Sequence, residues 1–247
     1  DLAEAQALGY AEADPTADVE GHDVQAKIAL IAKLAYGTTV PVSEIPTTGI
    51  SSIDAVDFEY AKMMNSTIKL LGTAKMNPGE IPSLSVYVSP VVVPQTHPVA
   101  AARGATNIVN VTSANLGSTS YVGPGAGRFP TANSVVSDVL RLAHGLTSKP
   151  FPVTTEVPLE PDYTSNFYLR ISISDTLGII RAVGEAAERN GVGIHSVVQN
   201  HINNPENVDF VVTTELCKYS EVQAMCDEIA SKDFALAPPL IMSLISS

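Results

Sequence analysis

Residues 167–179 read FYLRISISDTLGI, an alternating apolar strand that turns, from Asp175 to Gly178, into the start of a helix. Working outward from this stretch, the helix is expected to reach Asn190. It is followed by a strand at 192–201, a polar turn at 203–205, a strand at 208–214, a helix at 219–232 and a strand near 240–245. The order βαββαβ predicts an antiparallel sheet with both helices on one face.

The chain before residue 165 has a different pattern. Between Glu80 and Asp138 it has no acidic residue and is rich in Val, Ile, Thr, Ser, Gly and Pro, which predicts strands and loops packed on both sides. The pattern predicts helices at 2–8, 22–36 and 53–65 and strands at 68–72, 84–93 and 108–111.

Four prolines in 149–164 predict an extended linker. We therefore expect an α+β protein with a mixed α/β region at 1–147, a linker at 148–164 and a ferredoxin-like unit at 165–247. A domain seldom begins inside a helix, so the predicted helix that stops at Gly9 indicates the remainder of a longer protein.

The composition restricts the function class. The 247 residues carry a formal net charge of −12 and are 45% hydrophobic. This balance argues against a nucleic-acid binder, which needs clustered Lys and Arg. No apolar run approaches the ~20 residues of a membrane helix, and no basic, apolar leader is visible. The two cysteines, Cys217 and Cys226, are expected to be small buried hydrophobes in a reducing compartment. We expect a cytoplasmic globular protein.

Residues 9–27, GYAEADPTADVEGHDVQAK, are the most informative stretch for function. A loop loaded with carboxylates leads into a helix, on which Asp23 and Lys27 are spaced i, i+4. One interpretation is a solvated loop with a helical ion pair worth ~0.2–0.5 kcal/mol. The other is a zwitterion site in which Glu12 and Asp18 hold an ammonium group and Lys27 meets an oxygen that gains charge.

This stretch resembles the homoserine dehydrogenase signature G-[aromatic]-x-E-x-D-P-x-x-D-[aliphatic]-x-G-x-D-x-x-x-K, and every fixed position is present. The resemblance implies NADP- or NAD-dependent interconversion of L-homoserine and L-aspartate 4-semialdehyde in threonine and methionine biosynthesis. It implies that Glu12, Asp18 and Asp23 bind substrate, that Lys27 and Asp23 are catalytic, with Lys27 as the acid/base, and that Gly9 lies against the nicotinamide cofactor.

The proposed chemistry suits these residue types. Hydride that arrives at an aldehyde carbon leaves alkoxide character on the oxygen, and a positioned acid contributes ~10²–10⁴-fold to such a step. Lysine carries a point charge and a mobile proton, which arginine does not. Neighbouring carboxylates favour the charged lysine, so either Lys27 itself or a water between Asp23 and Lys27 transfers the proton.

A second motif, YVGPGAGRFPTAN at 121–133, has the glycines of a phosphate loop with the wrong spacing for a complete dinucleotide fingerprint. It matches the second homoserine dehydrogenase motif, G-x-G-A-G-x-x-P-T-A. A helix is expected at 130–144, opening at Pro130. The resemblance implies that Gly125 and Gly127 bind the cofactor and that 128–146 returns to a nucleotide-binding domain. The Rossmann loop G-x-G-x-x-G is missing from the chain. We therefore expect Val135, Val136, Val139 and Leu140 to be exposed or covered by a neighbour, and the chain alone not to bind NADPH tightly or to turn over homoserine.

The unit at 165–247 resembles an ACT domain, and residues 175–179 match its D-x-x-G-[aliphatic] turn. The resemblance implies pairing of subunits and an amino-acid effector, with threonine as the candidate. Effector contacts would come from Asp175, Gly178 and Ile179, and from Gln199 or Asn200 of the facing subunit, with coupling through the linker and the dimer contact. A dimer-forming module without a ligand is the alternative for this unit.

The five histidines are scattered, so we expect no metal site. For the whole chain we predict part of a homoserine dehydrogenase that forms homodimers or homotetramers. The alternative class is a non-catalytic dimeric amino-acid-binding regulatory protein, against which the intact Glu12, Asp23 and Lys27 argue. The sequence leaves NADP and NAD equally open.

Overall fold

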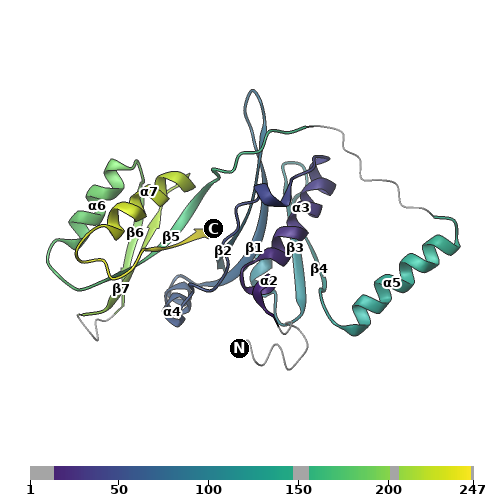
Figure 1. The fold of residues 1–247 in the computed structure, drawn as a ribbon, viewed down its shortest axis with the longest axis horizontal. Helices are drawn as coiled ribbons and strands as arrows, with labels where there is room; N and C mark the ends of the chain where they lie inside the picture. The colour runs from purple at the N-terminus through teal and green to yellow at the C-terminus, as the bar shows by residue number, and fades with distance from the viewer. Residues whose placement is uncertain (1–13, 147–155, 201–205, 246–247) are drawn as a thin grey trace.

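The N-terminal region consists of helices packed on a long antiparallel hairpin (Figure 1). The computed structural model describes residues 14–146, 156–200 and 206–245. The predicted helix at 22–36 is confirmed at both ends, and those near 53–65 and at 130–144 are present. The predicted helix at 2–8 lies outside the described residues. The elements are α2 (Thr16–Val19), α3 (His22–Tyr36), η1 (Val42–Glu44), α4 (Ala55–Met63), β1 (Ser66–Asn77), β2 (Ser83–Pro94), η2 (Pro98–Ala101), β3 (Thr106–Ser113), β4 (Gly117–Pro124) and α5 (Arg128–Ala143).

The C-terminal region has the predicted βαββαβ order, with one short additional strand before the second helix. Its elements are β5 (Thr164–Ile173), α6 (Ile179–Arg189), β6 (Ile194–Gln199), β7 (Val208–Thr214), β8 (Cys217–Lys218), α7 (Tyr219–Ala230) and β9 (Leu240–Leu244). The four long strands pair antiparallel in the order β9-β5-β7-β6. The two helices contact each other and pack on one face of this sheet (Figure 1).

The two regions share a single sheet, in the order β1-β2-β9-β5-β7-β6, with β8 paired to β5. The junction is the parallel pairing of β2 with β9, in which Val91 lies opposite Ser243 and Val92 opposite Leu244. Strand β9 therefore pairs with β2 of the first region on one side and with β5 on the other.

One cluster of the hydrophobic core lies between α3 and the β1–β2 hairpin. Helix α3 buries Ile28, Ala29 and Ala32 against β2, almost all of which is buried. A Cβ on Gly72 of β1 would lie 2.8 Å from Cβ of Ile28. Glycine at this position therefore permits the close approach of helix to strand that seats α3.

The two faces of the C-terminal sheet pack against different partners. Because side chains alternate along a strand, β5 sends Phe167, Leu169 and Ile171 toward α6 and α7 and Tyr168 toward the other face. There Tyr168 packs with Tyr60 of α4. Helix α4 of the N-terminal region thus covers the face of the sheet opposite the two C-terminal helices.

One expectation about the middle of the chain needs correction. Strand β2 is buried as predicted, but β3 and β4 form a separate hairpin whose side chains are partly buried or exposed, so packing on both sides is wrong there. The described part of the predicted linker is extended but is not free. The amide of Leu84 donates a hydrogen bond to the carbonyl of Pro158, and the amide of Glu160 donates to the carbonyl of Leu84. The buried ring of Tyr163 stacks on Tyr87 at a centroid distance of 3.6 Å.

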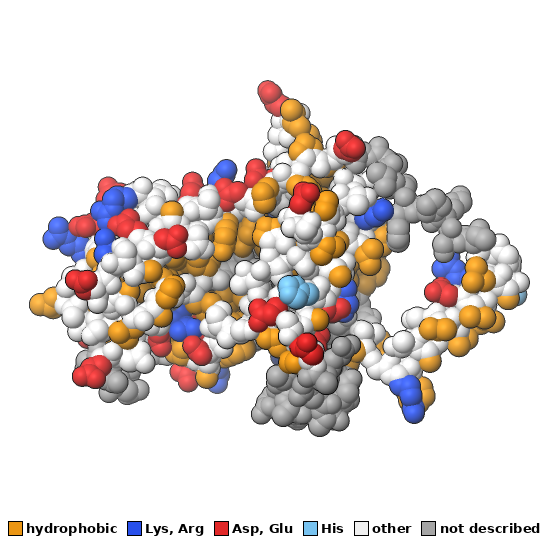
Figure 2. Space-filling view, in the orientation of Figure 1, with side chains coloured by type: hydrophobic (Ala, Val, Ile, Leu, Met, Phe, Trp, Pro, Cys, Tyr) orange, Lys and Arg blue, Asp and Glu red, His pale blue; other side chains and the backbone are white. Residues whose placement is uncertain are grey.

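Helix α5 stands apart from the sheet (Figure 1) and buries none of its residues. Val135, Val136, Val139 and Leu140 are each more than half exposed, as predicted. Apolar side chains follow this helix in the space-filling view (Figure 2). Among the described helices, none is long and apolar enough to cross a membrane.

Candidate active site

The best candidate site lies on the first turns of α3, where Asp23 and Lys27 form an ion pair. The Nζ of Lys27 donates to Oδ2 of Asp23 at 2.6 Å. The two side chains are 49% and 45% exposed, so the ammonium group is held in place yet remains open to a ligand. This is the i, i+4 geometry that the spacing predicts.

A tight corner carries the chain from α2 into α3. Gly21, which precedes α3, has φ of +82°, a conformation that glycine adopts at little cost. It is buried, and a Cβ there would lie 3.2 Å from Cγ1 of Val88 and 3.3 Å from Cγ2 of Thr47. The corner is therefore pressed against β2, and it orients α2 relative to the first turn of α3.

The carboxylates before the corner lie on the surface. Asp18 is exposed on α2, and Asp14 accepts hydrogen bonds from the backbone and hydroxyl of Thr16. Those hydrogen bonds lower the pKa of Asp14 below its usual value. Acidic side chains gather over α2 and the start of α3 (Figure 2). Glu12 and Gly9 lie outside the described residues.

Sequence reasoning missed the residues that hold this corner. Glu20 accepts a hydrogen bond from Oγ of Ser51 at 2.6 Å, and the amide of Gln25 donates to the carbonyls of Val42 and Ile45. These contacts join residues 17 to 31 positions apart, so no local spacing could have indicated them.

Gly125 and Gly127 occupy the turn between β4 and α5. Gly127 has φ of +113°, and the nearest atom to a Cβ there would be Cδ of Pro130, at 3.7 Å. Its backbone is therefore accessible to a ligand, which fits a nucleotide contact. A Cβ on Gly125 would lie 2.1 Å from the exposed side chain of Asn107, which would have to move to admit it.

Comparison with known proteins identifies the family. The homoserine dehydrogenase family model matches residues 1–140, more than half of the chain and all of α2, α3 and the Gly125–Gly127 turn. This chain belongs to the homoserine dehydrogenase family.

Several relatives of known family resemble the chain over most of its length. Homoserine dehydrogenases of Synechocystis and Pseudomonas aeruginosa are each 35% identical to it, over 99% and 84% of the chain. The crystal structure of a homoserine dehydrogenase from Thiobacillus denitrificans is 30% identical and superposes with a TM-score of 0.86 over 99% of the chain. The chain spans only 59%, 50% and 57% of these three proteins.

Beyond the family match, the residues expected to bind an effector lie in the C-terminal unit. Strands β5 and β6 both run antiparallel to β7, so they run in the same direction. Their carboxyl ends therefore lie at the same end of the sheet, beside the start of β7. Asp175, which follows β5, and Gln199, which ends β6, are therefore at this end of the sheet and are both exposed. Gly178 precedes α6 with φ of +92°. Ile179 is 5% exposed and belongs to the core, which leaves its side chain no room to contact a ligand.

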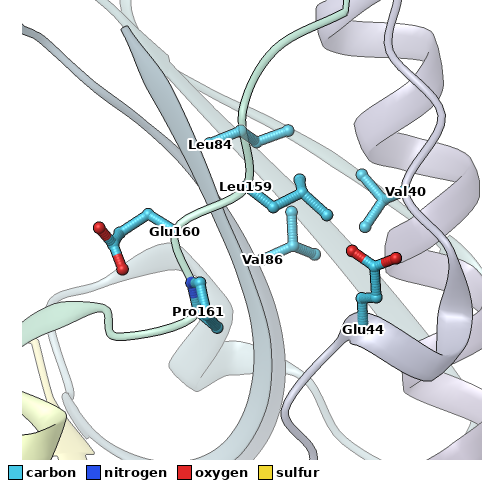
Figure 3. A pocket seen from close by; sticks show the side chains of 7 residues that line it. All are labelled: Val40, Glu44, Leu84, Val86, Leu159, Glu160 and Pro161. Atoms are coloured by element: carbon cyan, nitrogen blue, oxygen red, sulfur yellow. The ribbon is translucent and has the colours of Figure 1, made fainter.

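One surface pocket among the described residues lies away from the Asp23–Lys27 pair. Val40, Leu84, Val86 and Leu159 form most of its wall, and Glu44 and Glu160 stand at its sides (Figure 3). None of the predicted site residues lines it. The pocket is a packing seam where residues 157–161 lie against β2. Among the described residues, no group of three or more His, Cys, Asp or Glu side chains is arranged to hold a metal ion.

Proposed function

We propose that this chain carries the substrate-binding and acid/base residues of a homoserine dehydrogenase that interconverts L-homoserine and L-aspartate 4-semialdehyde with NADP or NAD. The reaction would serve threonine and methionine biosynthesis in the cytoplasm, where Cys217 and Cys226 stay reduced. The observation that carries the proposal is the half-exposed Asp23–Lys27 ion pair inside the family-matched segment. A degenerate, non-catalytic protein would not need this pair.

The acid/base chemistry follows from the ion pair. A bound nicotinamide supplies or accepts the hydride at the carbon that bears the oxygen. The ammonium group of Lys27 stabilises alkoxide character on that oxygen and moves the proton, either directly or through a water held between Lys27 and Asp23. Asp23 fixes the position of the ammonium group, with its Oδ2 at 2.6 Å from Nζ of Lys27.

The carboxylates before α3 select for an amino acid. Glu12 and Asp18 would pair with the substrate ammonium group, because opposite charges attract at close range. No lysine or arginine lies among the carboxylates that precede Lys27 to compete for them. Seven acidic residues precede Lys27, the first basic residue. A substrate without the ammonium group would lose this contact.

The cofactor contacts of this chain are few. Gly9 and Gly127 would contact the nucleotide, with Gly125 beside them, and the remaining contacts would come from a Rossmann domain on which α5 packs. Since the chain spans only 50% and 59% of two relatives, we expect residues 1–247 alone to bind NADPH weakly and to lack steady-state activity.

The C-terminal unit fits an ACT-type effector module. Its support is the antiparallel order β9-β5-β7-β6 with two helices on one face, and the exposed turn at Asp175 before α6. The backbone N–H groups at the start of α6 would favour the carboxylate of an amino acid such as threonine. Pairing of two subunits, as a homodimer or within a homotetramer, would bring Gln199 of the facing copy to the ligand.

The test of the catalytic proposal is Lys27→Ala in the full-length protein that carries this chain. We expect kcat to fall by ~10²-fold or more with a smaller change in KM for the semialdehyde, because a transition-state contact is lost. Glu12→Ala should instead raise KM, because the substrate ammonium loses a partner. Steady-state kinetics with homoserine and with the semialdehyde measure both.

Lys62→Ala is the matched control, because Lys62 is an exposed lysine on α4. Its kinetics should equal those of the unsubstituted enzyme. Near-normal kcat/KM in both Lys27→Ala and Glu12→Ala would show that the site assignment is wrong.

A further inference from the structure

Residues 46–52, the crossing segment, run between η1 and α4 and are anchored to β2. The amide of Thr48 donates to the carbonyl of Val88 at 2.9 Å, and the amide of Val88 donates to the carbonyl of Pro46 at 2.9 Å. Thr47 thereby forms a parallel bridge with Val88. One side of the crossing segment is thus attached to the most deeply buried strand of the N-terminal region.

The other side of the crossing segment holds the end of α2. The amide of Ile50 donates to the carbonyl of Val19 at 2.9 Å, and the hydroxyl of Ser51 donates to the carboxylate of Glu20 at 2.6 Å. Between them, a Cβ on Gly49 would lie 2.5 Å from the carbonyl oxygen of Val19 and 2.7 Å from Cα of Glu20. Only glycine permits so close an approach of two backbones.

The two halves of the candidate active site are therefore held by different contacts. Helix α3, which carries Lys27, is seated by burial of Ile28, Ala29 and Ala32. Helix α2, which carries Asp18 and buries no residue, is attached through Val19 and Glu20 to the crossing segment. A shift confined to residues 49–51 would move Asp18 and leave the Asp23–Lys27 pair in place, because α3 is held by its buried face and by the hydrogen bonds of Gln25.

We propose that Gly49 and Ser51 are positioning residues that set the place of Asp18 relative to Lys27 in the substrate site. This inference rests on the proposed function, in which Asp18 holds the substrate ammonium group. Because that contact is the same in the ground state and the transition state, its loss raises KM rather than lowering kcat. The pH profile of kcat stays unchanged, because Lys27 and Asp23 do not move.

The experiment compares variants in the full-length enzyme. A Cβ at Gly49 must displace a backbone, and a misplacement of about 1 Å at a reacting site costs up to ~10²-fold. We expect Gly49→Ala to raise KM for homoserine roughly tenfold or more, with kcat within about twofold. Ser51→Ala should raise KM about threefold, the low end of one hydrogen bond, and Ser51→Thr, which keeps the hydroxyl, should restore it.

Two further measurements separate positioning from general structural damage. Gly184→Ala, at a helical glycine whose Cβ would meet nothing within 4 Å, should change no kinetic constant. In an Asp18→Asn background, Gly49→Ala should add little to the KM already raised, because both changes remove one contact.

The proposal is overturned if Gly49→Ala and Ser51→Ala leave KM unchanged while Asp18→Asn and Lys27→Ala impair the enzyme. The proposal is also overturned if the increase in KM of the double variant equals the product of the increases caused by Gly49→Ala and Asp18→Asn alone. If Gly49→Ala does not fold, the KM of Ser51→Ala is compared with that of Ser51→Thr. An increase in KM in the first variant but not in the second supports the proposal, and its absence overturns it. Normal kinetics in Asp18→Asn and Lys27→Ala instead refute the proposed function itself.

Discussion

At the scale of single residues, a buried polar cluster joins the two regions of the chain. Asp57 of α4 is fully buried, and it accepts hydrogen bonds from the hydroxyl of Tyr168 at 2.8 Å and from Nε of Arg170 at 2.9 Å. Burial, and secondarily the charge of Asp57, raise the pKa of Tyr168 far above its usual value, so its hydroxyl remains a donor. Arg170 also pairs with Asp54 at 2.9 Å.

We expect Asp57→Ala to lower the free energy of unfolding by about 3–5 kcal/mol, because it leaves the buried Tyr168 hydroxyl and one side of Arg170 without a partner. Urea denaturation followed by circular dichroism measures the change. Glu59→Ala, on an exposed position of the same helix, should stay within about 0.5 kcal/mol of the unsubstituted protein. A loss of less than 1 kcal/mol in Asp57→Ala would mean that the cluster contributes little to folding.

The cysteines behave as the sequence predicts. Cys217 and Cys226 are 6% and 2% exposed and are not paired. Burial raises the pKa of the Cys226 thiol to about 12. Because the thiolate is the reactive form, Cys226 fills space in the core and has no nucleophilic role at neutral pH.

At the scale of elements, α5 shows that a local sequence pattern can predict a helix without indicating what packs against it. The helical pattern at 130–144 predicts the element, which begins two residues earlier and ends one residue earlier in the structure, at Arg128–Ala143. No residue of α5 is buried, although its valines and leucines form an apolar stripe. A stripe of this kind is typical of a helix that packs on another surface, which supports the proposed contact with a Rossmann domain.

Val136→Asp tests this contact. In the 247-residue chain we expect a change of at most about 0.5 kcal/mol in the free energy of unfolding, because Val136 is already 56% exposed. In the full-length enzyme the same variant should lower the melting temperature and the affinity for NADPH. Val93→Ala, at a fully buried position of β2, is expected to destabilise both chains. Equal behaviour of Val136→Asp in the short and full-length chains would count against the contact.

At the scale of the whole molecule, the parallel pairing of β2 with β9 joins the two regions directly. The sequence suggests coupling through a Pro-rich linker and a dimer contact. In the described structure β9 connects directly to β2, and Val88 of β2 contacts the corner at Gly21 and the crossing segment. We propose that an effector bound at the C-terminal unit acts on the substrate site along β9 and β2.

Threonine titration tests the regulatory proposal. Calorimetry on the 247-residue chain should detect binding at millimolar threonine, and the full-length enzyme should change its apparent affinity for homoserine by roughly 5–150-fold. The whole chain is used because β9 of the C-terminal unit also pairs with β2. Asp175→Ala should weaken binding, whereas Glu188→Ala, on the exposed surface of α6, should not. Absence of heat together with threonine-insensitive activity would leave the unit as a structural module.

The sequence by itself determined the local features of this protein. Periodicity and glycine punctuation were enough for α3, α4, α5 and the βαββαβ order, because these depend on residues within one or two turns of each other. The i, i+4 spacing likewise predicted the Asp23–Lys27 pair, and the motif at 9–27 identified the family that the comparisons show.

Only the tertiary structure decided which elements meet. Three contacts join residues 31 to about 150 positions apart: the β2–β9 junction, the Asp57–Arg170 ion pair and the hydrogen bond from Ser51 to Glu20. Local sequence patterns do not specify such contacts, because each depends on how two segments far apart in the sequence pack against each other. The hairpin of β3 and β4 is a further example of what local sequence does not specify. Its apolar composition predicts strands but not whether another surface covers them.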